Sequence, residues 1–217
     1  MKSRFKAKLW VGVMALLSLT SCQGLFENIY DAPQSAEDVK YGFIMHSNQT
    51  RIGRIYIDAT DYAKWHYVNL STRQVIAQSV SDKAPAEWDF AIHRYDVKTN
   101  GGAVAETMIK EFGQLPAVAT FSPEQYVADQ WTTQVIKTDV SQMMDGVIRY
   151  AEDYYNACIS QWLHVDTSTM PPLYTLSGRI YLLRLSDGSQ AALRLNNFMN
   201  DKGEKGYMTI DYQYPVE

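Results

Sequence analysis

The stretch RIYLLRLSDGSQAALRL, residues 179–195, decides the fold class of this 217-residue chain. Two apolar runs flank a short polar segment, and Asp187-Gly188 stands at its centre. Asp-Gly favours the tight turns of two-residue hairpin loops, because both residues tolerate positive φ angles. The stretch therefore predicts an antiparallel β-hairpin.

The same kind of pattern recurs on both sides of this hairpin. A second hairpin is predicted at the C-terminal end, where the turn at 200–203 leads into an alternating strand over 206–214. Strand patterns also occupy residues 54–58, 65–70, 75–77, 88–97 and 103–109. These patterns predict a mostly β fold built from antiparallel strands.

One segment departs from the strand period. Apolar residues recur at spacings of three and four between Ile148 and Trp162, so we predict a short helix somewhere within 147–163. Its neighbours, 111–146 and 164–175, are long and irregular, and such loops in a compact domain are usually functional or mobile. The expected fold is mostly β and antiparallel, with one or two short helices and a pocket formed by long loops.

The N-terminal segment has the features of a secretory signal peptide. Four basic residues open it: Lys2, Arg4, Lys6 and Lys8. The apolar run 9–19, about eleven residues long, is too short to span a bilayer of about 30 Å. Leu19-Thr20-Ser21-Cys22 then resembles the site at which bacterial lipoprotein precursors are cleaved and lipidated.

This pattern predicts the division of the chain. We expect a signal peptide over 1–21, lipidation of Cys22, an anchor and tether over 22–45, and a β domain over 46–217. Several acyl chains, at roughly 0.8 kcal/mol for each buried methylene, would make the anchor effectively permanent.

Charge and cysteine content exclude several classes of protein. Without residues 1–21 the chain has 20 − 4 = 16 basic and 24 acidic residues, a formal net charge of −8. Nucleic-acid affinity rests on Lys and Arg neutralising phosphates, and membrane-surface binding rests on polybasic segments, so both are disfavoured. Cys158 is then the single cysteine besides Cys22, which excludes an internal disulfide and a cysteine-based metal site.

No sequence motif indicates an enzyme. A nucleophile elbow, a His-Glu-x-x-His motif, a phosphate loop and a dinucleotide fingerprint are all absent. The four histidines, His46, His66, His93 and His164, include no pair at metal-ligand spacing. Within the predicted strand 88–97, we interpret His93 as a histidine hydrogen-bonded between strands.

Three methionines lie in the irregular segments: Met143, Met144 and Met170. A methionine in a loop either fills a gap in a core or offers its thioether to a soft metal, such as haem iron or copper(I). The pattern alone leaves both interpretations open.

Four sequence blocks point to a known family. They are DYAKWHY at 61–67, WDFAIHRYDVKTNGG at 88–102, LYTLSGRIY at 173–181 and KGYMTIDYQYP at 205–215. Together they resemble the HmuY-like haem-binding lipoproteins, which are haemophores of Gram-negative anaerobes, whereas residues 104–170 match poorly. The resemblance implies a β fold with a haem pocket formed by long loops, and a protein that is not an enzyme. It also implies haem capture and delivery to a TonB-dependent outer-membrane receptor for iron acquisition.

The resemblance also implies where the haem ligands lie. In the family, two axial ligands come from the region before the short helix and from the loop after a Trp-Leu block, here Trp162-Leu163. Some members use a histidine pair and others a methionine pair. The histidine positions fall near Ser141 and Thr167, neither of which can serve.

The sulfurs nearest these positions are therefore assigned as axial ligands, Met143 and Met170. Met144 is an alternative for the first position and His164 for the second. Aromatic residues expected to line the haem slot are Trp65, Tyr67, Trp88 and Tyr95, and Arg94 is expected to meet a propionate.

The predicted location follows from combining the two resemblances. Cys22 would hold a non-catalytic haem carrier at the outer membrane, on the cell surface or the periplasmic face. Two alternatives without haem stay open. One is a surface adhesion or structural lipoprotein on the same scaffold, and the other is a glycan-binding lipoprotein, suggested by the aromatic content.

Overall fold

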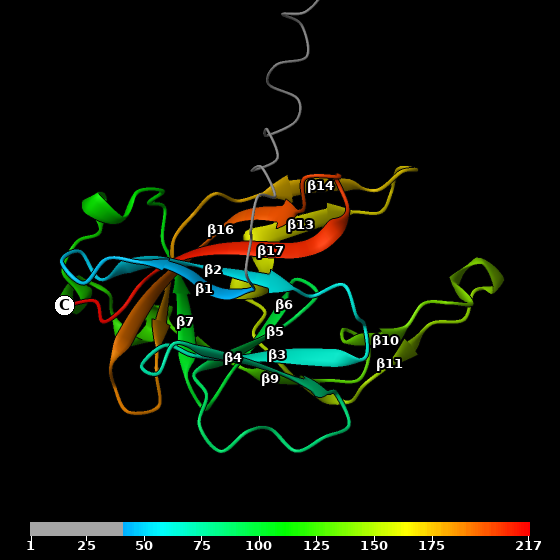
Figure 1. Ribbon diagram of the computed structural model, residues 1–217, viewed down its shortest axis with the longest axis horizontal. Helices are drawn as coiled ribbons and strands as arrows, with labels where there is room; N and C mark the ends of the chain where they lie inside the picture. Colours follow the sequence, from blue (N-terminus) through cyan, green and yellow to red (C-terminus); the bar gives the residue numbers. More distant parts are fainter. Residues whose placement is uncertain (1–40) are drawn as a thin grey trace, which may run out of the picture. The chain divides into compact units, whose positions relative to one another are not determined.

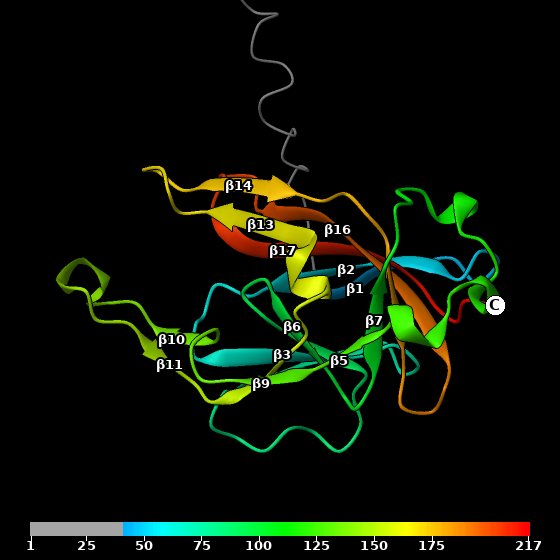
Figure 2. The same cartoon turned by 180° about the vertical axis from the view of Figure 1, so that it is seen from behind.

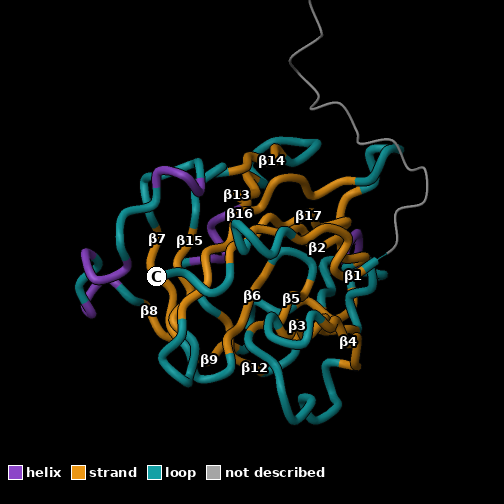
Figure 3. The backbone as a smooth tube through the Cα atoms, turned by 60° about the vertical axis from the view of Figure 1, so that its left-hand side comes forward, coloured by secondary structure: helices purple, strands orange, loops and turns teal. Residues whose placement is uncertain are grey.

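The computed structural model describes residues 41–217, and within this range the chain is mostly β with antiparallel pairing throughout. The predicted fold class is therefore confirmed. Helical structure in the described range consists of short 3-10 turns between the strands (Figure 3). No helix among these residues is long and apolar enough to cross a membrane.

The larger sheet has seven strands in the order β1-β2-β17-β16-β15-β7-β8 (Figure 1). The strands are β1 (Gly42–His46), β2 (Ile52–Asp58), β7 (Ala103–Glu106), β8 (Val127–Ala128), β15 (Tyr181–Arg184), β16 (Gln190–Met199) and β17 (Lys205–Gln213). Both C-terminal hairpins predicted from the sequence are present, β15–β16 around Asp187-Gly188 and β16–β17 around the turn at 200–203.

The smaller sheet has four strands in the order β4-β3-β5-β6. Its strands are β3 (Lys64–Asn69), β4 (Gln74–Ser79), β5 (Phe90–His93) and β6 (Asp96–Thr99). The β3–β4 hairpin pairs the strand patterns at 65–70 and 75–77.

The main core lies between these two sheets. The larger sheet contributes Ile55, Ile57, Leu193 and Ile210, and the smaller sheet contributes Val68, Phe90, Ile92 and Val97. Each of these side chains is at most 2 % exposed, and burial of a side chain of this size contributes about 1.5–3 kcal/mol. Alternation of buried and half-buried residues along β2 shows directly how the sequence pattern places one face on this core.

Three short antiparallel ladders complete the strands of the described range. They are β9 (Gln130–Thr132) with β12 (Asp153–Tyr155), β10 (Lys137–Asp139) with β11 (Arg149–Tyr150), and β13 (Leu163–Asp166) with β14 (Leu173–Leu176). The 3-10 turns are η1 (Phe112–Gln114), η2 (Val118–Thr120), η3 (Pro123–Gln125), η4 (Met143–Asp145) and η5 (Ile159–Trp162).

The short helix predicted within 147–163 is present as the four-residue 3-10 turn η5, much shorter than the apolar pattern from Ile148 to Trp162 suggested. The rest of the segment includes the short strands β11 and β12. The residues at spacings of three and four therefore do not share one helical face. Ala151 packs beside the Trp65 cluster, Tyr154 is exposed on β12, and Trp162 is buried in the main core.

The long strand predicted over 88–97 is also wrong, because a tight turn divides it. Arg94 has a positive φ of 56°, and His93 pairs with Asp96 across the turn between β5 and β6. A non-glycine residue with positive φ is uncommon, and the sequence pattern gave no sign of one here.

The start of the domain also differs from the prediction. The β domain was expected to begin at residue 46, but β1 already pairs with β2 from Gly42 onward. The end of the predicted tether is therefore an edge strand of the larger sheet. The signal peptide over 1–21, Cys22 and most of the tether lie outside the described residues.

Candidate functional site

Two hairpins extend from the two packed sheets at the same end of the domain (Figures 1 and 2). We call residues 137–150, which comprise β10, η4 and β11, the first arm. Residues 163–176, which comprise β13, β14 and the loop between them, are the second arm. The second arm nearly coincides with the irregular segment 164–175. The first arm begins in the irregular segment 111–146 and ends with β11 in the segment predicted to contain a helix.

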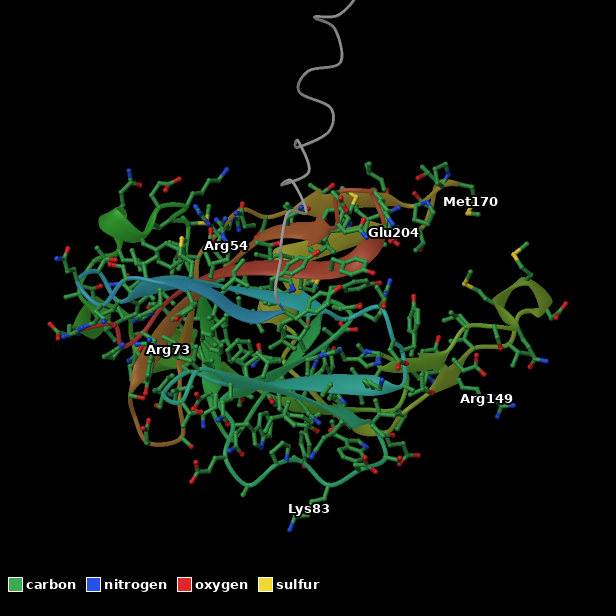
Figure 4. The ribbon with its side chains drawn as sticks, in the orientation of Figure 1. Arg54, Arg73, Lys83, Arg149, Met170 and Glu204 are labelled. Carbon is green, nitrogen blue, oxygen red and sulfur yellow. The ribbon has the colours of Figure 1, made fainter. Side chains whose placement is uncertain are left out.

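Each arm has an exposed methionine at its tip. Met143 begins the turn η4 and its side chain is 53 % exposed, and the neighbouring Met144 is 91 % exposed. Met170 lies in the loop of the second arm and is 87 % exposed (Figure 4). Thioethers this exposed fill no core, so the gap-filling interpretation of these three methionines does not hold in the described structure.

The turns at both tips are held by short side chains. In the first arm, the Asp139 carboxylate accepts a hydrogen bond from the Ser141 backbone N–H at 2.8 Å. In the second arm, the Asp166 carboxylate accepts one from the Ser168 backbone N–H at 2.8 Å. These hydrogen bonds lower the pKa of each aspartate, so both carboxylates are ionised at neutral pH.

A groove of about 380 Å³ lies between the bases of the two arms. Lys137 of the first arm lines one side, and His164 and Thr167 of the second arm line the other. Its remaining lining includes Tyr62, Tyr95 and Tyr155, together with His93 and Asp96 from the β5–β6 turn. The volume falls within the 300–1,000 Å³ typical of small-molecule and cofactor sites.

The β5–β6 hairpin holds the base of the second arm. The Trp162 indole N–H, directly before that arm, donates a hydrogen bond to the Tyr95 carbonyl at 2.8 Å. The Ser160 hydroxyl accepts a hydrogen bond from the Val97 N–H at 3.2 Å. Because Trp162 and Ser160 are themselves buried, this attachment is rigid.

The same hairpin holds the base of the first arm, which emerges between β9 and β12. The Lys98 ammonium of β6 lies 2.7 Å from the Asp153 carboxylate of β12. The Asn156 N–H, just beyond β12, donates to the Val97 carbonyl at 2.7 Å. One short hairpin therefore fixes the positions from which both arms extend.

His93 is buried at the base of the groove. Its Nε2 donates to the Tyr62 carbonyl at 2.8 Å, and its Nδ1 is buried with no hydrogen-bond partner in the structure. Burial lowers the pKa of His93 to about 4, so the ring is neutral at pH 7. The predicted hydrogen-bonded histidine is confirmed, although its partner is a loop carbonyl before β3.

The pKa of Asp96 is shifted upward, whereas that of His93 is shifted downward. Burial raises the pKa of its carboxyl to about 7, although the nearby Lys137 ammonium acts to lower it. Sequence analysis did not single out Asp96 or Lys137 as site residues. Asp96 lay within the resemblance block 88–102, but no local pattern indicated that Lys137, on an irregular segment, would face it.

The pKa shifts of His93 and Asp96 predict opposite effects of pH on the free energy of unfolding. The low pKa of His93 contributes stability that is present above pH 6.5 and is lost as the pH falls toward 4. The high pKa of Asp96 contributes stability that is present below pH 3.8 and is lost as the pH rises through 7. Each effect is roughly 2–3 kcal/mol after allowance for solvent screening.

The two contributions offset each other between pH 7 and 4, so single substitutions should separate them. Asp96→Asn is expected to make the protein lose stability on acidification, and His93→Gln to make it gain stability. Urea unfolding of both variants at several pH values in this range measures the two slopes. Equal slopes in the two variants would show that these groups do not control the pH response.

Arg94 does not point freely into the groove. Its Nη1 donates to the Ala59 and Thr60 carbonyls, at 3.2 and 3.1 Å, and its guanidinium lies over the Tyr62 ring. Gly206, with φ +107°, allows this close approach, since a Cβ there would collide with the Arg94 guanidinium. Arg94 thus bonds the loop after β2 and lies against Gly206 of β17, as well as lining the groove.

Of the four aromatic residues expected to line the haem slot, Tyr95 is the one that lines this groove. Trp65 and Tyr67 are at most 3 % exposed and pack with Trp88 around the Lys98 ammonium, away from the groove lining. A strand pattern shows which residues share a face but not which layer covers that face. For the same reason Tyr62 and Tyr155 were missed.

Within residues 41–217, no group of three or more His, Cys, Asp or Glu side chains is arranged to hold a metal ion. Ser141 and Thr167 stand near the positions where the family resemblance placed histidine ligands. Thr167 lines the groove, and the Ser141 backbone N–H donates a hydrogen bond to the Asp139 carboxylate. His164 of the second arm is exposed and lines the same groove.

Comparison with known proteins identifies the family. A profile of the family described as HmuY protein matches residues 61–212. The chain belongs to the HmuY family. The match begins just before β3 and ends within β17, so it includes both arms and the hairpin that holds them.

Solved structures agree with membership of the HmuY family. A Bacteroides vulgatus protein assigned as an HmuY-like haem-binding protein is 51 % identical, with a TM-score of 0.77, over 82 % of this chain and 100 % of that one. A protein from Bacteroides fragilis assigned as a lipoprotein is 47 % identical, with a TM-score of 0.77, over 85 % and 100 % of the two chains.

A more distant structure shares the fold of this HmuY-family chain. It is the apo form of an HmuY analogue from Tannerella forsythia, 24 % identical with a TM-score of 0.62, over 83 % of this chain and 100 % of that one. A search of curated proteins returned no match.

Proposed function

We propose that this protein is a haemophore that binds haem in the groove between its two arms, with Met143 and Met170 as axial ligands. The observation that carries the proposal is the pairing of the arms. Two separate hairpins border one groove, and each has an exposed methionine at its tip, outside the residues that line the groove. Family membership and the description of the Bacteroides vulgatus relative as haem-binding support the choice of ligand.

The donor set of the arms fits haem iron. A thioether is a soft, neutral donor that binds haem iron and raises its reduction potential, which favours the ferrous state. Unlike a free histidine, a thioether does not protonate at any physiological pH. His164 and Met144 remain the alternative donors, one on each arm.

The groove also offers the other groups that haem needs. Tyr62, Tyr95 and Tyr155 supply flat apolar surface, and the Lys137 ammonium at the rim is placed to pair with a propionate. Arg94 is the weaker candidate for a propionate, because its Nη1 already donates to two carbonyls.

The proposed role is transport and not catalysis. Bound haem supplies the iron that is carried, and two protein ligands leave no free axial position for turnover. We propose further that Cys22 carries a lipid anchor and that the protein hands its haem to a TonB-dependent receptor at the outer membrane. The description of the Bacteroides fragilis relative as a lipoprotein supports the anchor.

Haem titration of the purified protein, oxidised and reduced, tests the proposal. We expect one equivalent of haem to bind and the reduced complex to show a six-coordinate low-spin spectrum. We expect weaker binding of ferric haem, because a thioether favours ferrous iron. Failure to bind haem in either state would contradict the proposal and favour an adhesion or glycan-binding lipoprotein.

A further inference from the structure

The methionines of the described chain divide sharply by exposure. Met208 is fully buried in the main core, and Met199 is half-buried beside it. Five others are exposed: Met45, Met108, Met143, Met144 and Met170. Three of these five lie at the two arm tips. Met144 and Met170 are the two most exposed, and Met143, at 53 %, still exposes about half of its surface.

Exposed thioethers are readily oxidised to methionine sulfoxide. A peroxide transfers one oxygen atom to the sulfur and leaves as water. The sulfur loses two electrons, the peroxide O–O bond breaks, and an S–O bond forms. Methionine sulfoxide reductases reverse the change, with a separate enzyme for each sulfoxide epimer. Two thiols supply two electrons and two protons and become a disulfide, the S–O bond breaks, and the oxygen leaves as water.

We propose that Met143 and Met170 form a redox switch on haem capture. Oxidation of the two thioethers by a peroxide turns haem binding off, and reduction by methionine sulfoxide reductases turns it on again. This inference rests on the proposed function, because it requires that the two sulfurs hold the iron.

The structure explains why oxidation at these positions has a large effect. A sulfoxide sulfur keeps one lone pair, but the attached oxygen withdraws electron density and makes the sulfur a weaker, harder donor to ferrous iron. The oxygen also makes the side chain polar. Met144, at 91 % exposure, is the most exposed methionine of the described range and oxidises at least as readily. Met144 therefore cannot replace Met143 as an unoxidised thioether ligand on the first arm.

The other exposed methionines provide the control. In the double variant Met45→Leu and Met108→Leu, the exposed methionines that remain in the described range all lie on the arm tips, at Met143, Met144 and Met170. The haem-free variant is treated with hydrogen peroxide, which is then removed with catalase. Peptide mass spectrometry locates the added oxygen, and haem titration under reducing conditions measures binding.

We expect oxygen on Met143 and Met170 but not on Met208, together with loss of the low-spin ferrous spectrum in proportion to the oxidised fraction. Treatment with both classes of methionine sulfoxide reductase should restore the spectrum. Normal binding by protein oxidised at both positions would overturn the switch, and so would a loss that the reductases do not reverse. Failure of the untreated variant to bind reduced haem would instead contradict the proposed ligands.

Discussion

Replacing Met143 and Met170 together with alanine is expected to abolish the six-coordinate low-spin spectrum of the reduced haem complex. The two residues lie on separate arms, so each removes an independent ligand. Loss of a residue that merely supports a ligand costs about 10–100-fold in metal affinity, and loss of both ligands should cost about 100-fold or more. Absorption spectra and haem titration measure both effects.

Matched controls separate ligation from a general effect of losing a methionine. Met108 is 77 % exposed on the loop after β7, so Met108→Ala should leave the spectrum unchanged. Met144→Ala and His164→Ala should also leave the spectrum unchanged, because in the proposed complex neither Met144 nor His164 binds the iron. An unaltered spectrum in the Met143→Ala/Met170→Ala double variant would refute the ligand assignment.

Lys98→Met is expected to destabilise the protein by about 3–5 kcal/mol, because it leaves the Asp153 carboxylate without its partner. The side chains of Lys98 and Asp153 are 9 % and 19 % exposed, and the ammonium lies 4.2 Å from the centre of the Trp65 ring. A loss of this size is a large fraction of the 5–15 kcal/mol typical of a folded domain. Urea unfolding gives the change in the free energy of unfolding.

An exposed ion pair in the same chain provides the comparison. Lys64 and Asp61 are 3.0 Å apart with side chains 49 % and 46 % exposed, so Lys64→Met should cost at most about 1 kcal/mol. Lys98→Met combined with Asp153→Asn should recover much of the loss, since no buried charge is then unpaired. Similar small losses at Lys98 and Lys64 would mean that the buried pair does not hold the first arm's base to β6.

Local sequence signals were sufficient to predict the hairpins of the two sheets. Asp187-Gly188 and the turn at 200–203 are local determinants, and strand-forming apolar segments flank both. The arms gave no such signal, because β10 and β11 have only three and two residues, too few to show a period. Their existence depends on tertiary support from the β5–β6 hairpin.

The resemblance block at 88–102 illustrates what sequence similarity conveys here. Its residues have structural roles in this chain. His93 donates to the Tyr62 carbonyl, Arg94 donates to the Ala59 carbonyl just after β2, and Lys98 pairs with Asp153 of β12. The block therefore identifies the scaffold, whereas the proposed ligands lie in segments where the resemblance is poor. Residue type and position on the arms had to supply the ligand prediction.

The central claim concerns which atoms hold the iron, and a crystal structure of the reduced haem-loaded protein tests it most directly. The account predicts haem in the groove between the arms, with the sulfurs of Met143 and Met170 bound to the iron on opposite faces. Iron bound to a His164 nitrogen or to the Met144 sulfur, or haem bound outside this groove, would contradict it.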